Sequence, residues 1–133
     1  MPPKVILTRP LPPSHLAGGA LLTRLAAEGT IDLVRWEQDT AVDRGWLLAE
    51  LRKGGVDGVL CMHNGEKIDD ELLDAAGPSL KVVSTMSAGY DHVDVAALKR
   101  RGVRLGTTPD ALTDATADVG AMLVLMASRR AGE

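Results

Sequence analysis

Residues 80–94 have the sequence LKVVSTMSAGYDHVD, in which a short aliphatic run gives way to small and hydroxyl-bearing residues. The run at residues 80–84 predicts a buried strand, and Asp94 is placed to cap the helix that follows. Between them, Ala88 and Gly89 would expose consecutive backbone N–H groups, which in a tight turn form a concavity suited to a carboxylate. On the residues alone, a turn that needs glycine for its dihedral angles is the simpler explanation.

The same alternation of strand and helix extends outward through most of the chain. Each of the first four predicted helices follows a residue that can cap it, Ser14, Asp43, Asp69 or Asp94, and precedes a glycine. Parallel strands need a helix-length return path, so this alternation favours a parallel sheet covered by helices on both faces. The predicted strands are residues 4–8, 31–35, 58–62, 80–84 and 103–105, and the predicted helices are residues 16–27, 46–53, 71–76, 95–101 and 113–130.

These elements predict an α/β domain over residues 1–112, with a flavodoxin-like, doubly wound sheet of five parallel strands. Ligands of such sheets bind outside the carboxyl ends of the strands. Three polar segments, residues 8–10, 63–65 and 87–89, follow predicted strands and would converge at that edge. We therefore expect the binding site to lie there.

The last predicted helix differs from the others, because residues 119–127 (VGAMLVLMA) contain no polar side chain. A helix that is apolar on every side should be buried all round. A domain of this size offers it too little surface, so we expect it to pack against a second domain. Residues 113–133 are thus predicted to be an interdomain helix that leads to a domain absent from this chain.

Composition narrows the possible partners and compartments. The 133 residues carry a net charge of −3 and only 2% aromatic residues, with no continuous basic stripe, which argues against nucleic-acid binding. The longest apolar run is far shorter than the ~20 residues of a membrane-spanning helix. Cys61 is the single cysteine, so neither an intrachain disulfide nor a thiolate metal cluster is expected, and a cytoplasmic location fits.

Two motifs in the right order resemble the D-isomer-specific 2-hydroxyacid dehydrogenases, and most closely their glyoxylate/hydroxypyruvate reductase branch. The stretch at residues 80–94 is similar to the substrate loop of that family. Residues 101–118 (RGVRLGTTPDALTDATAD) are similar to its strand, its TPD turn and the helix that crosses into its cofactor domain. Residues 4–10 and 58–77 extend the resemblance through nearly the whole chain.

The resemblance implies a function for the candidate site. In such an enzyme the backbone of Ala88 and Gly89 would hold the carboxylate of a small 2-oxo acid, glyoxylate or hydroxypyruvate, and Ser87 would also contact the substrate. The loop that contains His63 and Asn64 would close over the substrate, with the positive charge of Arg9 nearby.

The resemblance also implies an NAD(P)H-dependent, homodimeric full-length enzyme. Its catalytic Arg, Glu and His, and its Gly-rich dinucleotide loop, are expected downstream of this chain, which contains no G-x-G-x-x-G motif. The chain alone is therefore expected to hold no catalytic residue, to bind no cofactor tightly and to be inactive. Thr113 and Thr116 would first cap the last helix, and only secondarily contact the nicotinamide.

Two departures from the family pattern leave the preferred substrate open. Asp118 stands where the family usually has Glu, and residues 63–66 (HNGE) stand where relatives tend to carry a Ser/Thr-Asp pair and one residue fewer. The choice between NADH and NADPH is also open, because the residue that reads the ribose belongs to the cofactor domain.

Several other residues have simpler explanations than chemistry. His92, beside the predicted substrate loop, would order that loop through hydrogen bonds, and Cys61 would be a small buried hydrophobic side chain. Three consecutive acidic residues, 69–71, suit a helix start better than a metal site.

A freestanding flavodoxin-like module, for example a flavin carrier or a receiver domain, is the alternative function. Residues 8–13 (TRPLPP) are rich in proline, where a flavin phosphate loop would be rich in Ser, Thr and Gly, and these proline residues have no N–H to donate. A receiver domain would need an acidic cluster after its early strands, where only Asp57 and Glu66 flank the third strand.

Overall fold

A computed structural model gives the fold of the chain and describes residues 1–10, 13, 17–61 and 66–132. The five predicted strands and five predicted helices are all present, with bounds shifted by one or two residues in most cases. The strands are β1 (Lys4–Leu7), β2 (Asp32–Arg35), β3 (Val56–Cys61), β4 (Val82–Thr85) and β5 (Arg104–Gly106). The helices are α1 (Ala17–Ala27), α2 (Arg44–Arg52), α3 (Asp70–Ala76), the 3-10 helix η1 (Gly77–Ser79), α4 (Val95–Arg100) and α5 (Thr113–Arg129).

The strands form one parallel sheet in the order β2-β1-β3-β4-β5, which confirms the predicted flavodoxin-like arrangement. Helix starts also follow the sequence prediction where the structure describes them. The side chains of Asp43, Asp69 and Asp94 accept hydrogen bonds from the backbone N–H groups three residues later. The predicted cap at Ser14 lies outside the described residues.

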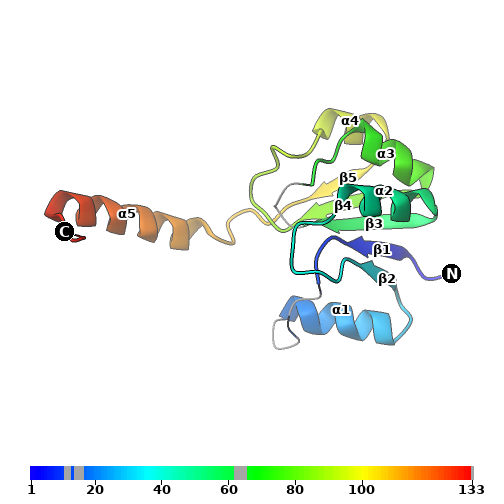
Figure 1. The fold of residues 1–133 in the computed structure, drawn as a ribbon, viewed down its shortest axis with the longest axis horizontal. Helices are drawn as coiled ribbons and strands as arrows, with labels where there is room; N and C mark the ends of the chain where they lie inside the picture. The colour runs from blue at the N-terminus through cyan, green and yellow to red at the C-terminus, as the bar shows by residue number, and fades with distance from the viewer. Residues whose placement is uncertain (11–12, 14–16, 62–65, 133) are drawn as a thin grey trace.

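The hydrophobic core lies between the sheet and α2, α3 and α4, which gather on one side of it (Figure 1). Helix α1 lies on the other side, near β1 and β2 (Figure 1). The core row across the sheet consists of Ile6, Val59 and Val83, which are neighbours in register and at most 2% exposed.

The opposite face of the sheet has α1 near β1 and β2 (Figure 1), in agreement with the expectation of helices on both faces, and is open at β4. Val5, Gly58 and Val82 are neighbours in register on this face, and a Cβ added to Gly58 would lie 3.4 Å from Val82. Val82, on β4, is 39% exposed.

Helix α5 extends away from the domain (Figure 1), and none of its residues is buried. Nothing among the described residues packs against α5, so its predicted burial against a second domain stays a prediction. Its apolar side chains, including Leu123 at 55% and Val124 at 70% exposure, face solvent. The predicted capping is wrong, because Leu112 occupies the N-cap position and no side chain of the described residues, neither that of Thr113 nor that of Thr116, caps the helix.

Candidate functional site

The carboxyl ends of β1, β3 and β4 lie at one edge of the sheet, because the three strands are parallel neighbours. The residues at or just beyond these ends are polar and buried: Thr8 and Thr85 are 0% exposed, and Glu66 is 4% exposed. His63 and Asn64, predicted to close over the substrate, lie outside the described residues. The edge is thus lined by hydroxyl groups and one carboxyl group.

The loop that follows β4 is anchored by backbone hydrogen bonds to two other parts of the domain. Met86 N–H donates to the carbonyl of Cys61 at 3.0 Å, which extends the pairing of β4 with β3. Thr108 N–H donates to the carbonyl of Ser87 at 3.0 Å, which connects the loop to the segment that leads toward α5. Both contacts hold residues 86 and 87 in place beside the ends of the strands.

Side-chain hydroxyl groups continue this anchoring. The oxygens Thr85 Oγ1 and Ser87 Oγ lie 2.8 Å apart, and Ser87 Oγ donates to the carbonyl of Gly89 at 2.6 Å. His92 Nε2 lies 3.3 Å from Thr85 Oγ1. The predicted loop-ordering role of His92 agrees with this contact. Hydrogen-bond contacts thus connect four groups in one row: the His92 ring, the Thr85 and Ser87 hydroxyl groups and the Gly89 carbonyl.

Ala88 and Gly89 lie at the exposed tip of this loop. Within the part of the chain that the structure describes, no acceptor takes a hydrogen bond from either backbone N–H. Gly89 is not among the residues with positive φ, and a Cβ added to it would meet no described atom within 4 Å. The simpler explanation offered above, a glycine required by its dihedral angles, therefore does not hold: this position is open rather than strained.

Arg9 follows the buried Thr8 at the end of β1, and its side chain is only 22% exposed. Its guanidinium group forms an ion pair with Asp39, with Nη1 and Oδ1 3.5 Å apart. Part of its positive charge is therefore balanced by an exposed carboxylate. Arg9 belongs to the same edge of the sheet as the β4 loop, as predicted from its place after β1.

Comparison with known proteins places the fold in a known enzyme family. Residues 21–128 match the family model described as "D-isomer specific 2-hydroxyacid dehydrogenase, catalytic domain". The chain belongs to this family. The candidate loop therefore lies in the catalytic domain of an oxidoreductase family, which agrees with the resemblance read from residues 80–94 and 101–118.

Individual members of the dehydrogenase family are similar over nearly the whole chain. The human glyoxylate reductase/hydroxypyruvate reductase is 39% identical over 132 residues, which cover 98% of this chain and 37% of the relative. A crystal structure of a protein from Thermus thermophilus superposes with a TM-score of 0.76 at 34% identity, covering 96% of this chain and 37% of that chain.

A second similar structure carries ligands. The NADPH-dependent glyoxylate/hydroxypyruvate reductase of Sinorhizobium meliloti, in complex with NADP and malonate, has a TM-score of 0.66 and 29% identity, covering 95% of this chain and 34% of that chain. The chain thus spans little more than a third of the length of the relatives it matches.

Cys61 lies beneath the loop of this dehydrogenase domain and is fully buried, as predicted. Burial raises the pKa of its thiol to about 11, and the nearby carboxylate of Glu66 acts in the same direction. The thiol donates to the carbonyl of Ser84 at 3.4 Å. Cys61 is therefore protonated at neutral pH and poorly suited to nucleophilic chemistry.

Glu66 and Thr85 were not singled out as site residues by sequence reasoning, although both are buried at the carboxyl edge. The available signal was their position, directly after the fourth predicted strand for Thr85 and four residues after the third for Glu66. A polar residue at that point faces the ligand edge in a parallel sheet.

The acidic residues 69–71 have structural roles, as predicted. Asp69 caps α3 and pairs with Arg44 at 2.6 Å, Arg44 also pairs with Glu71 at 2.8 Å, and Asp70 pairs with Arg101 at 2.7 Å. Over the described residues, no group of three or more His, Cys, Asp or Glu side chains could hold a metal ion.

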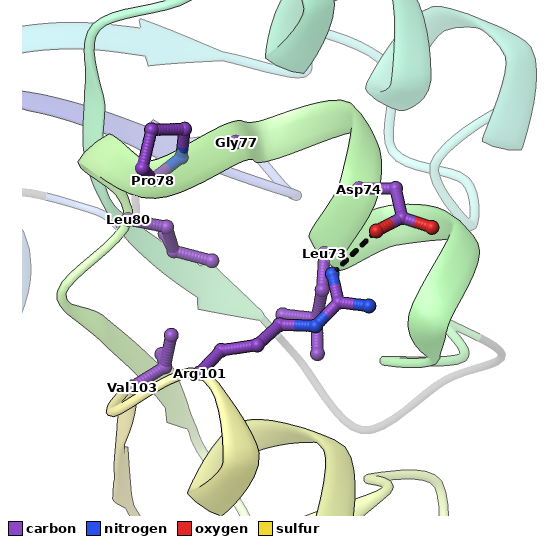
Figure 2. A pocket seen from close by; sticks show the side chains of 7 residues that line it. All are labelled: Leu73, Asp74, Gly77, Pro78, Leu80, Arg101 and Val103. Carbon is purple, nitrogen blue, oxygen red and sulfur yellow. Dashed lines mark hydrogen bonds and ion pairs between the residues drawn. The ribbon is translucent and has the colours of Figure 1, made fainter.

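A cavity of about 430 Å³ opens at the opposite edge of the sheet, near the starts of β4 and β5 (Figure 2). Arg101 and Asp74 face each other across it in an ion pair of 2.8 Å, and its remaining walls are largely apolar. It lies at the far ends of the strands from the Ser87–Gly89 loop and shares no residue with it. We therefore assign it no part in the candidate site.

The part of the chain that the structure describes contains no helix with the length and apolar character needed to span a bilayer.

Proposed function

We propose that this chain forms the substrate-binding part of an NAD(P)H-dependent reductase of small 2-oxo acids, with glyoxylate and hydroxypyruvate as the substrates. The observation that carries the proposal is the β4 loop: Ala88 and Gly89 expose backbone N–H groups with no acceptor among the described residues, at the edge of the sheet where such folds bind ligands. The names of the human and Sinorhizobium relatives support the same substrate class.

The loop would contribute binding and orientation. Two adjacent N–H donors match the two oxygens of a carboxylate, and hydrogen bonds to a charged acceptor are stronger than those between neutral groups. Arg9 would add positive charge at the same edge, and the loop with His63 and Asn64 would close over the bound acid. A carboxylate held in this way fixes the direction in which the neighbouring carbonyl group points, which is a large part of catalysis for a reaction between two bound molecules.

Hydride transfer also needs a nicotinamide, a cation beside the carbonyl oxygen and a proton donor. No glycine-rich loop in this chain fits a dinucleotide, since the turn after β1 is Thr8-Arg9-Pro10 and the sequence has no G-x-G-x-x-G. We therefore assign cofactor binding and the catalytic Arg, Glu and His to the rest of the protein. NAD(P)H would supply the hydride there, and this chain would contribute at most weak contacts from Thr113 and Thr116.

The division of the chain follows from the same reasoning. Residues 1–112 would form the substrate domain, and residues 113–133 would form the helix that packs against the cofactor domain and so covers the exposed apolar side chains of α5. The whole enzyme would be a homodimer in the cytoplasm, where a single cysteine stays reduced.

A chimeric enzyme, called the joined enzyme below, tests this proposal. The matched segment of the human glyoxylate reductase/hydroxypyruvate reductase would be replaced by this chain, and reduction of glyoxylate and hydroxypyruvate would be followed through the absorbance of NADH or NADPH. We expect activity from the joined enzyme and none from the isolated chain. Reduction by the isolated chain, or tight binding of flavin to it, would contradict the proposal.

A further inference from the structure

We infer that His92, Thr85 and Ser87 form a directed row of hydrogen bonds that fixes the orientation of the Ala88 and Gly89 N–H groups. His92 Nε2–H donates to Thr85 Oγ1, the Thr85 hydroxyl donates to Ser87 Oγ, and the Ser87 hydroxyl donates to the Gly89 carbonyl. The three side chains would be positioning residues, which act on the substrate only through the loop. This inference rests on the proposed carboxylate-binding function of that loop.

The hydrogen bond that Ser87 donates determines the direction of the whole row. Its hydroxyl has one hydrogen, and a carbonyl oxygen can only accept, so the contact of 2.6 Å to the Gly89 carbonyl uses that hydrogen. Ser87 Oγ therefore has only lone pairs left for its other neighbour. This also means that Ser87 has no hydrogen to donate to a substrate, although its position next to Ala88 suggested a direct contact.

The direction of the Thr85 hydroxyl hydrogen follows from that of Ser87. Its oxygen lies 2.8 Å from Ser87 Oγ, a distance typical of an O–H···O hydrogen bond. Because the Ser87 hydrogen is committed, the Thr85 hydroxyl must donate here. The sulfur of Cys61, which also lies beside Thr85, is a much weaker acceptor than a hydroxyl oxygen, and its own hydrogen is donated to the Ser84 carbonyl.

The tautomer of His92 follows from the direction of the Thr85 hydrogen bond. Thr85 has given its only hydrogen to Ser87, so it can only accept from His92 Nε2, 3.3 Å away. His92 must therefore carry a hydrogen on Nε2. A neutral imidazole in this place is the Nε2–H tautomer.

The row acts on the loop through a closed ring. The hydrogen bond from Ser87 Oγ to the Gly89 carbonyl encloses the backbone of Ala88 and Gly89, so it restricts the dihedral angles that aim their N–H groups. Thr85 is fully buried and holds Ser87 in the rotamer that makes this bond. A pair of N–H donors that is ordered before the ligand arrives loses less conformational freedom on binding.

The tautomer of His92 provides a direct test that needs no ligand. A long-range proton–nitrogen correlation spectrum of the ¹⁵N-labelled chain, recorded at a pH where His92 is neutral, distinguishes the protonated from the unprotonated ring nitrogen. We expect the hydrogen on Nε2. A neutral ring with its hydrogen on Nδ1 would overturn the inference, whether or not the loop binds a carboxylate.

Substitutions with malonate as the probe test the effect on binding. Thr85→Val keeps the volume and removes the hydroxyl, and we expect it to weaken malonate binding, followed by the amide signals of Ala88 and Gly89, by roughly three- to tenfold. Thr85→Ser restores the hydroxyl and should return affinity to the wild-type value. His92→Gln keeps an N–H donor and should bind better than His92→Leu.

The outcomes separate the two proposals. Equal affinity of wild type and a folded Thr85→Val variant would overturn the positioning role. If the valine variant does not fold, the comparison of His92→Gln with His92→Leu and the tautomer measurement decide instead. Wild-type amides that do not respond to malonate would contradict the proposed function, while the tautomer would still show whether the row exists.

Discussion

Replacing Gly89 by valine should separate ligand binding from folding. The structure gives no conformational reason for glycine at this position, since Gly89 is not in the left-handed region, and no described atom lies within 4 Å of an added Cβ. A branched side chain should therefore fit the free domain. It would, however, occupy the space in front of the Ala88 and Gly89 N–H groups, where we propose that the carboxylate binds.

The substitution should change the free energy of unfolding far less than it changes the KM for glyoxylate. An exposed substitution without steric conflict changes the free energy of unfolding by about 0.5 kcal/mol or less. A hydrogen bond to a charged group contributes roughly 1.5–3 kcal/mol, so losing one of the two amide contacts should raise the KM for glyoxylate about 10- to 150-fold. The KM for NADPH should change little, because the cofactor is held elsewhere.

The assay uses the joined enzyme described above, with glyoxylate varied at saturating NADPH and then NADPH varied at saturating glyoxylate. Gly89→Ala is the matched control, because a single methyl group blocks less space and should give an intermediate KM. Thermal unfolding of both variants checks that the fold is retained. An unchanged KM for glyoxylate in a folded Gly89→Val enzyme would remove Ala88 and Gly89 from the site and refute the reasoning.

Three further predictions concern the domain itself. The Cys61 thiol should resist iodoacetamide at about pH 8 in the folded chain and react once denaturant exposes it, because burial raises its pKa to about 11; rapid labelling of folded protein would contradict this. Burial alone would raise the pKa of Asp69, but hydrogen bonds from Arg44 and the Leu72 N–H hold it below its ordinary value. The Asp69 carboxylate therefore stabilises the fold above about pH 4, and this contribution is lost as the pH falls through the lower folded pKa. Asp69→Asn should cost about 0.5 kcal/mol at pH 7 in urea titrations, and this cost should shrink as the pH falls through the lowered pKa of Asp69. A cost that does not depend on pH would argue against the ion pair. Removing residues 113–133 should leave the unfolding midpoint within about 3 °C, because no residue of α5 is buried; a large drop would show that α5 packs on the domain in solution.

Local patterns in the sequence were sufficient to predict the sheet. Short aliphatic runs separated by helix-length segments allow few arrangements other than a parallel sheet, and the observed order β2-β1-β3-β4-β5 is the flavodoxin-like one. Asp43, Asp69 and Asp94 were predicted as caps because their side chains need only the backbone three residues ahead. Such short-range hydrogen bonds depend little on the rest of the fold.

Other features depend on contacts that a sequence pattern does not reveal. The apolar composition of α5 indicated burial, but burial needs a partner surface, and none lies within the described residues. The row from His92 to Gly89 depends on which hydroxyl hydrogen points where, which follows only from distances between residues up to seven positions apart. Glu66 was noted as a departure from the family, yet its burial beside Cys61 required the structure.

The β4 loop, which we propose to bind the carboxylate, is connected to two other parts of the domain. The loop is anchored to β3 through Met86 and to the segment before α5 through the hydrogen bond from Thr108 to Ser87. Thr108 belongs to the segment that leads toward α5, the helix that we propose crosses to the cofactor domain. The backbone that would hold the carboxylate is therefore hydrogen-bonded to the connection between the two proposed domains, so the position of the loop is set by both the sheet and this connection.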